Sequence, residues 1–267
     1  MADEVDPNVR NGPVRGGAPA VARAVAELRL LARSDEPLGV LAVARAAGLV
    51  PSTALHILRA LAREELVAVD PETRRYSLDA GILTQAGQWL GRNPFAARAQ
   101  AVLQALARRH RVTAIGVQVR DLDHILVVAI AQAEHRLQLH AEIGSRFPAL
   151  ISATGRCIAA FGDHPWPEIE ARFRTLRWDR PPPLDAWRAD VAAAAHNGYA
   201  LDVGHYMAGV TVVSAPVFDG AGRMTHAVVA VGTTDHIEDI GRDALIADAK
   251  DVARRLSAAG ETGAGSG

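Results

Sequence analysis

Apolar residues recur at helical spacing in two neighbouring segments near the start of the chain. They fall at positions i, i+3, i+4 and i+7 in each segment. The first set is Val40, Val43, Ala44 and Ala47, and the second is Ala54, Ile57, Leu58 and Leu61. Gly48 stands where the first helix must end and reverse, and Pro51 suits the first turn of the second helix. The pattern predicts two helices joined by a tight turn.

The period then changes from helical to alternating. Segments 66–69 and 75–78 alternate apolar and polar residues around the turn residues 70–73, Asp-Pro-Glu-Thr. This predicts a β-hairpin. A helix-turn-helix followed by a hairpin is a winged helix, whose second helix fits the major groove of DNA.

The polar face of the second helix suits nucleic acid. Hydroxyl, imidazole and guanidinium groups can bind base edges and phosphates, and an exposed Leu55 would be able to reach a thymine methyl group. On the helix alone, an ordinary amphipathic helix with a solvated face is the favoured interpretation, but a hairpin that carries arginines shifts the balance towards DNA. The candidate DNA-binding residues are Arg15 in the N-terminal arm, then Ser52, Thr53, Leu55, His56, Arg59 and Arg63, and Arg74 and Arg75 in the wing.

The remaining pattern divides the chain into domains. A first helix is predicted over 19–33, with an inward stripe of Val21, Ala24, Val25, Leu28, Leu31 and Ala32. The predicted organisation is a disordered arm (1–17), a winged helix-turn-helix domain (18–79), a linker helix (80–93), a second domain (94–258) and a disordered tail (259–267).

The second domain mixes strands and helices without strict alternation. Helices are predicted over 95–109, 152–161, 166–175, 184–196 and 243–256, strands over 112–119, 124–130, 137–143, 199–202, 210–217 and 225–231, and a loop over 144–148. This order indicates an α+β fold with a mainly antiparallel sheet.

Four stretches together resemble the IclR-type transcriptional regulators. They are GAPAVARAVAELRLLARSDEPL, then GLVPSTALHILRALAREELV with DPETRRYSLD, then GSRFPALISATGRCIAAF, and finally GYALDVGHYMAGVTVVSAPVFDGAGRM. The resemblance covers residues 17 to about 258. It implies a winged helix-turn-helix and a GAF-like effector-binding domain, in a ligand-responsive regulator of metabolic or catabolic genes that acts as repressor or activator. The effector-binding residues implied are Leu137, Leu139, Ala153, Thr154, Gly155, Asp202, Val210, Val212, Val229 and Val231.

Several positions depart from the resembled family. Glycine stands at 39, where the family often has a capping Ser or Thr, and Pro51 and His56 replace basic residues. Arg59 and the wing therefore gain importance for DNA contact. Relatives that bind small organic acids can carry Cys or Ser at positions like Val212, Val229 and Val231. Three valines favour an aromatic or longer-chain acid, held at the small-residue helix start 152–155. Asp202 would repel such an anion if it faced the cavity.

Charge and cysteine usage limit the alternatives. The 267 residues carry a formal net charge of −1, so DNA affinity needs a local patch. Residues 15–92 hold ten arginines and eight acidic residues, a net charge of +2, so paired half-sites of a palindromic operator and a homodimer or tetramer are expected. The single cysteine, the absence of a long apolar run and the acidic start predict a cytoplasmic protein without a membrane anchor.

The sequence carries no motif that demands catalysis. It has no GxSxG elbow, phosphate-binding loop or HExxH, and Cys157 has the apolar neighbours of a core residue. Neither a cofactor nor a metal is expected. The alternative is a metabolite-binding protein or enzyme whose N-terminal module serves assembly, and salt-dependent binding to a DNA palindrome separates the two.

Overall fold

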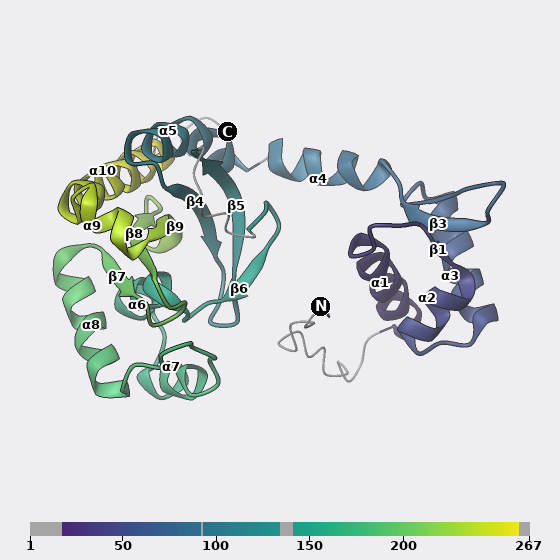
Figure 1. Ribbon diagram of the computed structural model, residues 1–267, viewed down its shortest axis with the longest axis horizontal. Helices are drawn as coiled ribbons and strands as arrows, with labels where there is room; N and C mark the ends of the chain where they lie inside the picture. Colours follow the sequence, from purple (N-terminus) through teal and green to yellow (C-terminus); the bar gives the residue numbers. More distant parts are fainter. Residues whose placement is uncertain (1–17, 92, 134–140, 262–267) are drawn as a thin grey trace. The chain divides into compact units, whose positions relative to one another are not determined.

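The computed structural model describes residues 18–91, 93–133 and 141–261 (Figure 1). Contacts divide the chain into two compact units, residues 1–89 and 90–267. This division falls near the end of α4 (Gly81–Gly91), whereas the sequence pattern placed it at Asn93–Pro94. Each unit is described by itself.

The first unit is a small helical domain with a three-stranded wing. Its elements are α1 (Pro19–Ala32), β1 (Leu38–Gly39), α2 (Val40–Ala47), α3 (Pro51–Arg63), β2 (Val67–Val69) and β3 (Arg75–Leu78). The antiparallel sheet has the order β1-β3-β2, and its two-residue strand β1 was not predicted. Gly48 ends α2 at a φ of 65°, a left-handed conformation that glycine adopts without steric cost. The predicted helix-turn-helix and hairpin are both present.

Helix α1 turns only part of the predicted stripe inward. Val21 and Val25 are 62% and 36% exposed, whereas Glu27 is fully buried and Leu31 is 4% exposed. The predicted stripe is therefore confirmed at Leu31 and wrong at both valines and at Ala32. A buried carboxyl group gives no hydrophobic signal, so apolar spacing alone could not find the inward face. The two valines remain on the surface of the unit.

The second unit is an antiparallel sheet covered by helices. Its elements are α5 (Pro94–His110), β4 (Thr113–Val119), β5 (His124–Gln132), β6 (Arg146–Pro148), α6 (Ser152–Phe161), α7 (Trp166–Phe173), α8 (Leu184–Asn197), β7 (Ala200–Val203), β8 (Val210–Phe218), β9 (Met224–Thr233), α9 (Thr234–Asp239) and α10 (Arg242–Glu261). The strand order is β6-β5-β4-β9-β8-β7, and all neighbours are antiparallel. The α+β class predicted from the sequence is confirmed.

Three local predictions in this unit need correction. Strand β6 lies where a loop was predicted, and α9 was not predicted. Residues 141–143 are not part of a strand, and the rest of the predicted strand 137–143 lies outside the described residues. Short elements such as β6 offer too few residues for a periodic pattern.

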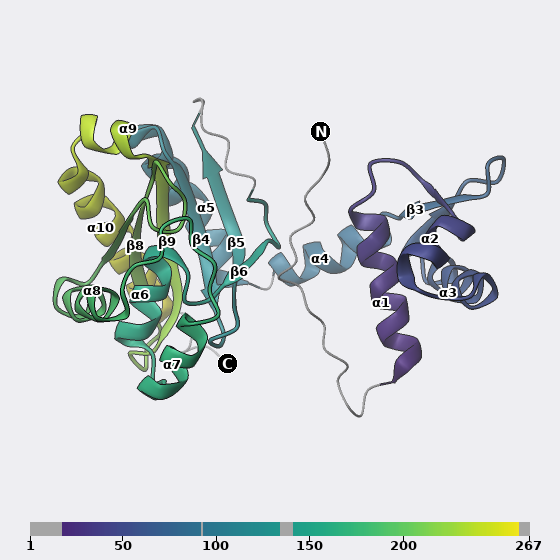
Figure 2. The same cartoon turned by 60° about the horizontal axis from the view of Figure 1, so that its bottom comes forward.

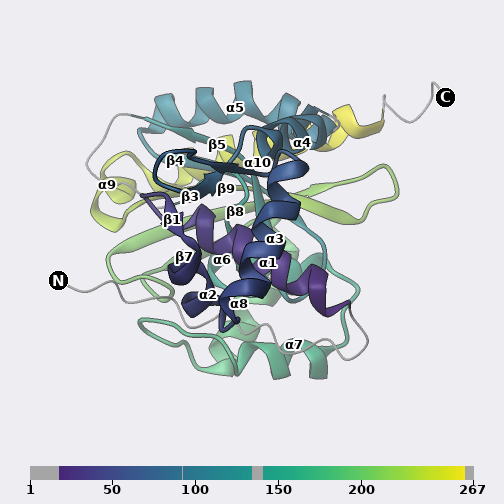
Figure 3. The ribbon, with the colours of Figure 1, turned by 90° about the vertical axis from the view of Figure 1, so that its right-hand side faces the viewer.

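The sheet separates two hydrophobic cores. Helices α5 and α10 pack on one face, and α6, α7 and α8 cover the other (Figures 2 and 3). Strand β9 shows the alternation, because Val228 and Ala230 join the first core whereas Val229 and Val231 join the second. The two valines consequently face the same side as α6.

No single helix in the described part of the chain is long and apolar enough to cross a bilayer. Helices α2 and α3 meet the length and composition criteria only when counted together, and they are bent by 108° at their break.

Candidate functional site

A basic hollow lies between α3 and the wing. We define this basic hollow by its lining residues, which are His56, Arg59, Ala62, Arg63, Val69, Arg74 and Tyr76. Its histidine and three arginines are exposed, and none of these lining residues is acidic. The hollow can therefore accept an anionic backbone, and it brings together four of the nine residues predicted to contact DNA.

The other predicted DNA-binding residues lie around or outside this hollow. Ser52 is exposed and Thr53 half-buried in the first turn of α3. Leu55 is half-buried and packs against the core of the unit, so the expectation that it is exposed is wrong. Arg75 donates a hydrogen bond from Nη1 to the carbonyl oxygen of Pro37 at 3.2 Å, and Arg15 lies outside the described residues.

The turn of the wing is held by a side-chain cap. Oδ1 of Asp70 accepts hydrogen bonds from the backbone N–H groups of Glu72 and Thr73 at 2.8 and 3.1 Å. These bonds, led by the one from Thr73, hold the pKa of Asp70 below its usual range. Arg74 follows with a φ of 56°, and the next residue enters β3. The capped turn thus fixes where Arg74 leaves the backbone beside the hollow.

The second unit contains an apolar cavity between its sheet and the start of α6. About 540 Å³ of empty space lies inside it, including its opening to solvent. We call this cavity the effector pocket, after the expectation from the sequence. Its lining residues are Ile115, Val117, Ile125, Val127, Phe147, Ile151, Ser152, Thr154, Tyr206, Met207, Val210, Val212, Val229 and Val231.

Five of the predicted effector-binding residues are in the wall of this pocket. They are Thr154, Val210, Val212, Val229 and Val231. Ala153 is fully buried in the core instead. Gly155 packs so closely that a Cβ atom there would lie 2.0 Å from the carbonyl oxygen of Leu150, so it serves packing. Leu137 and Leu139 lie outside the described residues.

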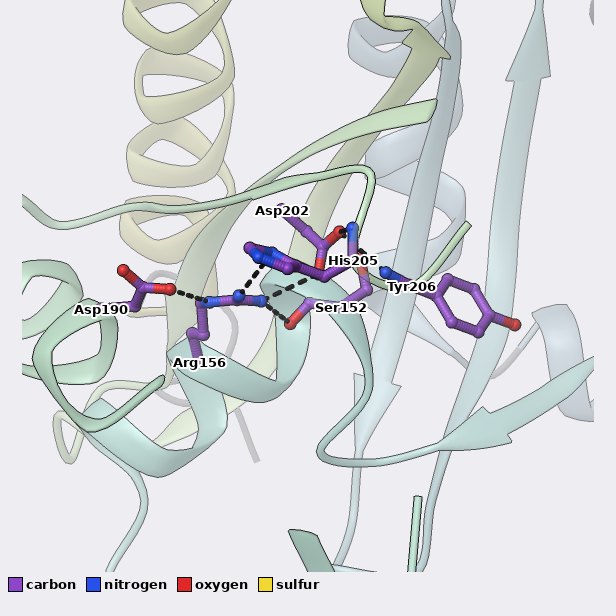
Figure 4. A network of polar contacts seen from close by, with 6 residues as sticks. All are labelled: Ser152, Arg156, Asp190, Asp202, His205 and Tyr206. Atoms are coloured by element: carbon purple, nitrogen blue, oxygen red, sulfur yellow. Dashed lines mark hydrogen bonds and ion pairs between the residues drawn. The ribbon is translucent and has the colours of Figure 1, made fainter. Parts of the chain in front are cut away.

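Asp202 does not line the pocket. It is 1% exposed, and its Oδ2 lies 2.9 Å from Nη1 of Arg156 (Figure 4). The expectation that it faces the ligand is corrected, because its charge is paired inside the protein. The partner stands 46 residues away in the sequence, so no local pattern could show the pair.

Ser152 is a pocket residue within the helix start predicted to hold the acid, although it was not among the individual effector-binding residues. It is 6% exposed, has a φ of 58°, and its Oγ has no hydrogen-bond partner among the described residues. A left-handed serine is strained, and a buried hydroxyl without a partner costs about 1–3 kcal/mol. No described side chain caps this start of α6 either. A bound acceptor could satisfy the hydroxyl.

Cys157 has no nucleophilic character. It is fully buried, and its Sγ donates to the carbonyl oxygen of Ser214 at 3.4 Å. Burial raises the pKa of its thiol to about 12. Among the residues that the structure describes, no group of three or more His, Cys, Asp or Glu side chains could hold a metal ion.

Family models cover most of the chain. The model described as the IclR helix-turn-helix domain matches residues 20–71, and the bacterial transcriptional regulator IclR C-terminal model matches residues 87–258. The chain belongs to the IclR family. Its members are transcriptional regulators that bind DNA and respond to a small molecule, so the first unit is the DNA-binding domain and the second the effector-binding domain.

Relatives agree with this membership. The glycerol operon regulatory protein of Streptomyces griseus is 31% identical over 222 residues, which cover 83% of this chain and 86% of the relative. The crystal structure of an IclR regulator from Alicyclobacillus acidocaldarius has a TM-score of 0.76 at 25% identity, covering 91% of this chain and 99% of that chain. An IclR homologue from Microbacterium hydrocarbonoxydans, described as complexed with 4-hydroxybenzoate, has the same fold, with a TM-score of 0.74 at 18% identity, covering 91% and 99%.

Proposed function

We propose that the chain regulates metabolic genes by binding a palindromic operator as a homodimer or larger homo-oligomer in the cytoplasm. We further propose that an aromatic or longer-chain acid changes its operator affinity. The observation that carries this proposal is the effector pocket, an apolar cavity with one unpartnered buried hydroxyl at its wall.

DNA binding is proposed to run through the basic hollow. Arg59 and Arg63 on α3 and Arg74 on the wing give three exposed guanidinium groups per subunit. If two subunits place all of them on phosphates, the logarithm of affinity falls with a slope of about −5 against the logarithm of salt concentration. A slope near zero for a palindromic fragment would contradict this interface.

Association is supported by apolar residues left on the surface. Val21 and Val25 on α1 are 62% and 36% exposed, and Leu83 and Trp89 on α4 are 73% and 40% exposed. Large exposed apolar side chains can mark an association surface where they gather. We expect Leu83→Asp to convert the dimer to monomer in sedimentation velocity, whereas the neighbouring exposed Thr84→Asp leaves it a dimer. A wild-type monomer with full operator affinity would contradict the proposal.

The effector class follows from the wall. Valine side chains offer no hydrogen bonds, and each desolvated ligand oxygen without a partner costs about 1–3 kcal/mol. Apolar surface buried against the same wall gains roughly 25 cal/mol per Å². Ser152 can anchor one polar group, and Arg156 neutralises Asp202, so a carboxylate meets no free anion from that residue. A polyol fits this apolar wall poorly. Glycerol, which appears in the name of the Streptomyces griseus relative, is such a molecule.

A thermal-shift screen tests the class. Benzoate, 4-hydroxybenzoate and octanoate are compared with glyoxylate and pyruvate at equal concentration. The proposal expects a rise in melting temperature with at least one of the larger acids. The control is a Val231→Trp protein, in which the larger side chain fills the pocket. Loss of the shift in this variant shows that the acid binds in the pocket. A shift only with glyoxylate or pyruvate would refute the class.

A further inference from the structure

A buried ionic network joins α6 to the connection between β7 and β8 (Figure 4). The side chains of Arg156 on α6 and Asp202 on β7 are each 1% exposed, and they form an ion pair of 2.9 Å. Nε of Arg156 also donates to Oδ2 of Asp190 at 3.0 Å. Nη2 of the same guanidinium lies 3.3 Å from Nδ1 of His205. These contacts hold it in one orientation.

The two charged groups each bind the backbone of a residue that lines the effector pocket. Nη1 of Arg156 donates to the carbonyl oxygen of Ser152 at 3.0 Å, at the strained first residue of α6. Oδ1 of Asp202 accepts from the backbone N–H groups of His205 and Tyr206, both at 3.1 Å. Ser152 and Tyr206 both line the pocket. The ion pair therefore links the wall that carries the free hydroxyl to the wall that carries the aromatic ring.

The segment that Asp202 holds is bounded by a glycine at each end. Gly204 and Gly209 flank it in left-handed conformations, with φ of 70° and 75°. Between them lie Tyr206 and Met207, the latter 39% exposed although it lines the pocket. In Figure 4 the ring of Tyr206 points away from the ion pair. Asp179 holds the far side of this segment, where its Oδ2 accepts from the N–H of Ala208 at 2.9 Å.

Stability alone does not account for such a pair. The cost of desolvating two buried charges commonly equals or exceeds their attraction, and apolar residues of similar volume stabilise a core as well or better. What the pair supplies is a fixed separation between two backbone segments. Its geometry is specified by hydrogen bonds to backbone groups on both sides.

We propose that Arg156 and Asp202 are positioning residues for the effector. They set the distance between Ser152 and the part of the pocket wall formed by Tyr206 and Met207. They do not contact the ligand themselves. Ligand affinity then depends on an ion pair behind the pocket wall. This inference rests on the proposed function only in taking the pocket as the effector site.

The test compares isosteric variants in the full-length protein. Asp202→Asn removes the charge, and Arg156→Lys keeps the charge but loses the multidentate geometry. Asp190→Asn is the matched control, because Asp190 binds the same guanidinium from a half-exposed position and contacts no pocket residue in Figure 4. Calorimetric titration measures the affinity for benzoate, 4-hydroxybenzoate and octanoate, and melting temperatures report folding.

We expect Asp202→Asn and Arg156→Lys to bind the acids at least tenfold more weakly, with operator affinity in the absence of acid unchanged. Asp190→Asn should stay within twofold of wild type. Equal affinity in wild type and Asp202→Asn would overturn the inference. An equal loss in the control, or a loss that follows the melting temperature across all variants, would overturn it too.

A second measurement keeps this test separate from the effector class. If none of the three acids binds the wild-type protein, the proposed class fails, and amide hydrogen exchange then decides about the ion pair. Faster exchange confined to residues 203–209 in Asp202→Asn supports the positioning role, whereas unchanged protection of His205 and Tyr206 refutes it.

Discussion

Glu27 makes the stability of the DNA-binding domain depend on pH in an unusual direction. It is fully buried on α1, and neither of its carboxylate oxygens has a hydrogen-bond partner among the described residues. Desolvation raises its pKa from 4.5 to about 7. The folded domain therefore keeps this proton to a higher pH than the unfolded chain does.

The size of the effect follows from linkage. A carboxyl with a raised folded-state pKa contributes its full stability below the unfolded value and loses it as pH rises towards the folded value. The slope between pH 4.5 and about 7 is roughly 1.4 kcal/mol per pH unit, so the limiting loss is about 3 kcal/mol. Glu27→Gln keeps the shape without the charge. We expect it to be more stable than wild type at pH 8, by no more than this amount, and the difference to shrink towards pH 5.

Hydrogen exchange followed by mass spectrometry measures this in the full-length protein. Peptides from α1, α2 and α3 are compared between wild type and Glu27→Gln at the same pH, so that intrinsic exchange rates cancel. Glu36→Gln, at an exposed site of the same unit, is the control and should show no difference. Slower exchange in wild type than in Glu27→Gln at pH 8, or no difference at pH 6 and 8, would refute the reasoning.

Three further predictions concern the two sites and the buried cysteine. Arg59→Ala should weaken operator binding in fluorescence anisotropy by about 1–3 kcal/mol if it reads a base, with a smaller loss on unrelated DNA, and unchanged affinity removes it from the interface. Val212→Thr places a hydroxyl in the apolar wall and should weaken binding of an apolar acid by about 1–3 kcal/mol in calorimetry, whereas tighter binding would contradict an apolar effector. Cys157 should react with a thiol reagent only after unfolding, because it is buried and its pKa is raised to about 12, and fast reaction in native buffer would contradict that burial.

The winged helix could be predicted because its signals are local. After Leu66 the spacing of apolar residues changes from helical to alternating, and Gly48 marks the end of α2. Both signals can be read from residues close together in the sequence. Val229 and Val231 were expected in the pocket from the family resemblance. Both line the cavity, because the two-residue repeat of strand β9 puts them on the same face of the sheet.

The remaining features depend on contacts between distant residues. Glu27 is a charged residue type that is buried, so the spacing of apolar residues along α1 could not reveal its position. The family resemblance placed Asp202 in the pocket, and no local pattern reveals that it pairs with Arg156 on a separate helix. The left-handed backbone of Ser152 and its unpartnered hydroxyl likewise depend on the folded structure.

The central claim is that acid binding in the pocket changes operator affinity. The most direct measurement is fluorescence anisotropy of the full-length protein on DNA from the region upstream of its own gene, across salt concentrations, with and without the acid that gives the largest thermal shift. We predict salt-dependent binding whose affinity changes at least fivefold with the acid, a coupling of about 1 kcal/mol. Equal operator affinity with and without an acid that saturates the pocket would contradict the account.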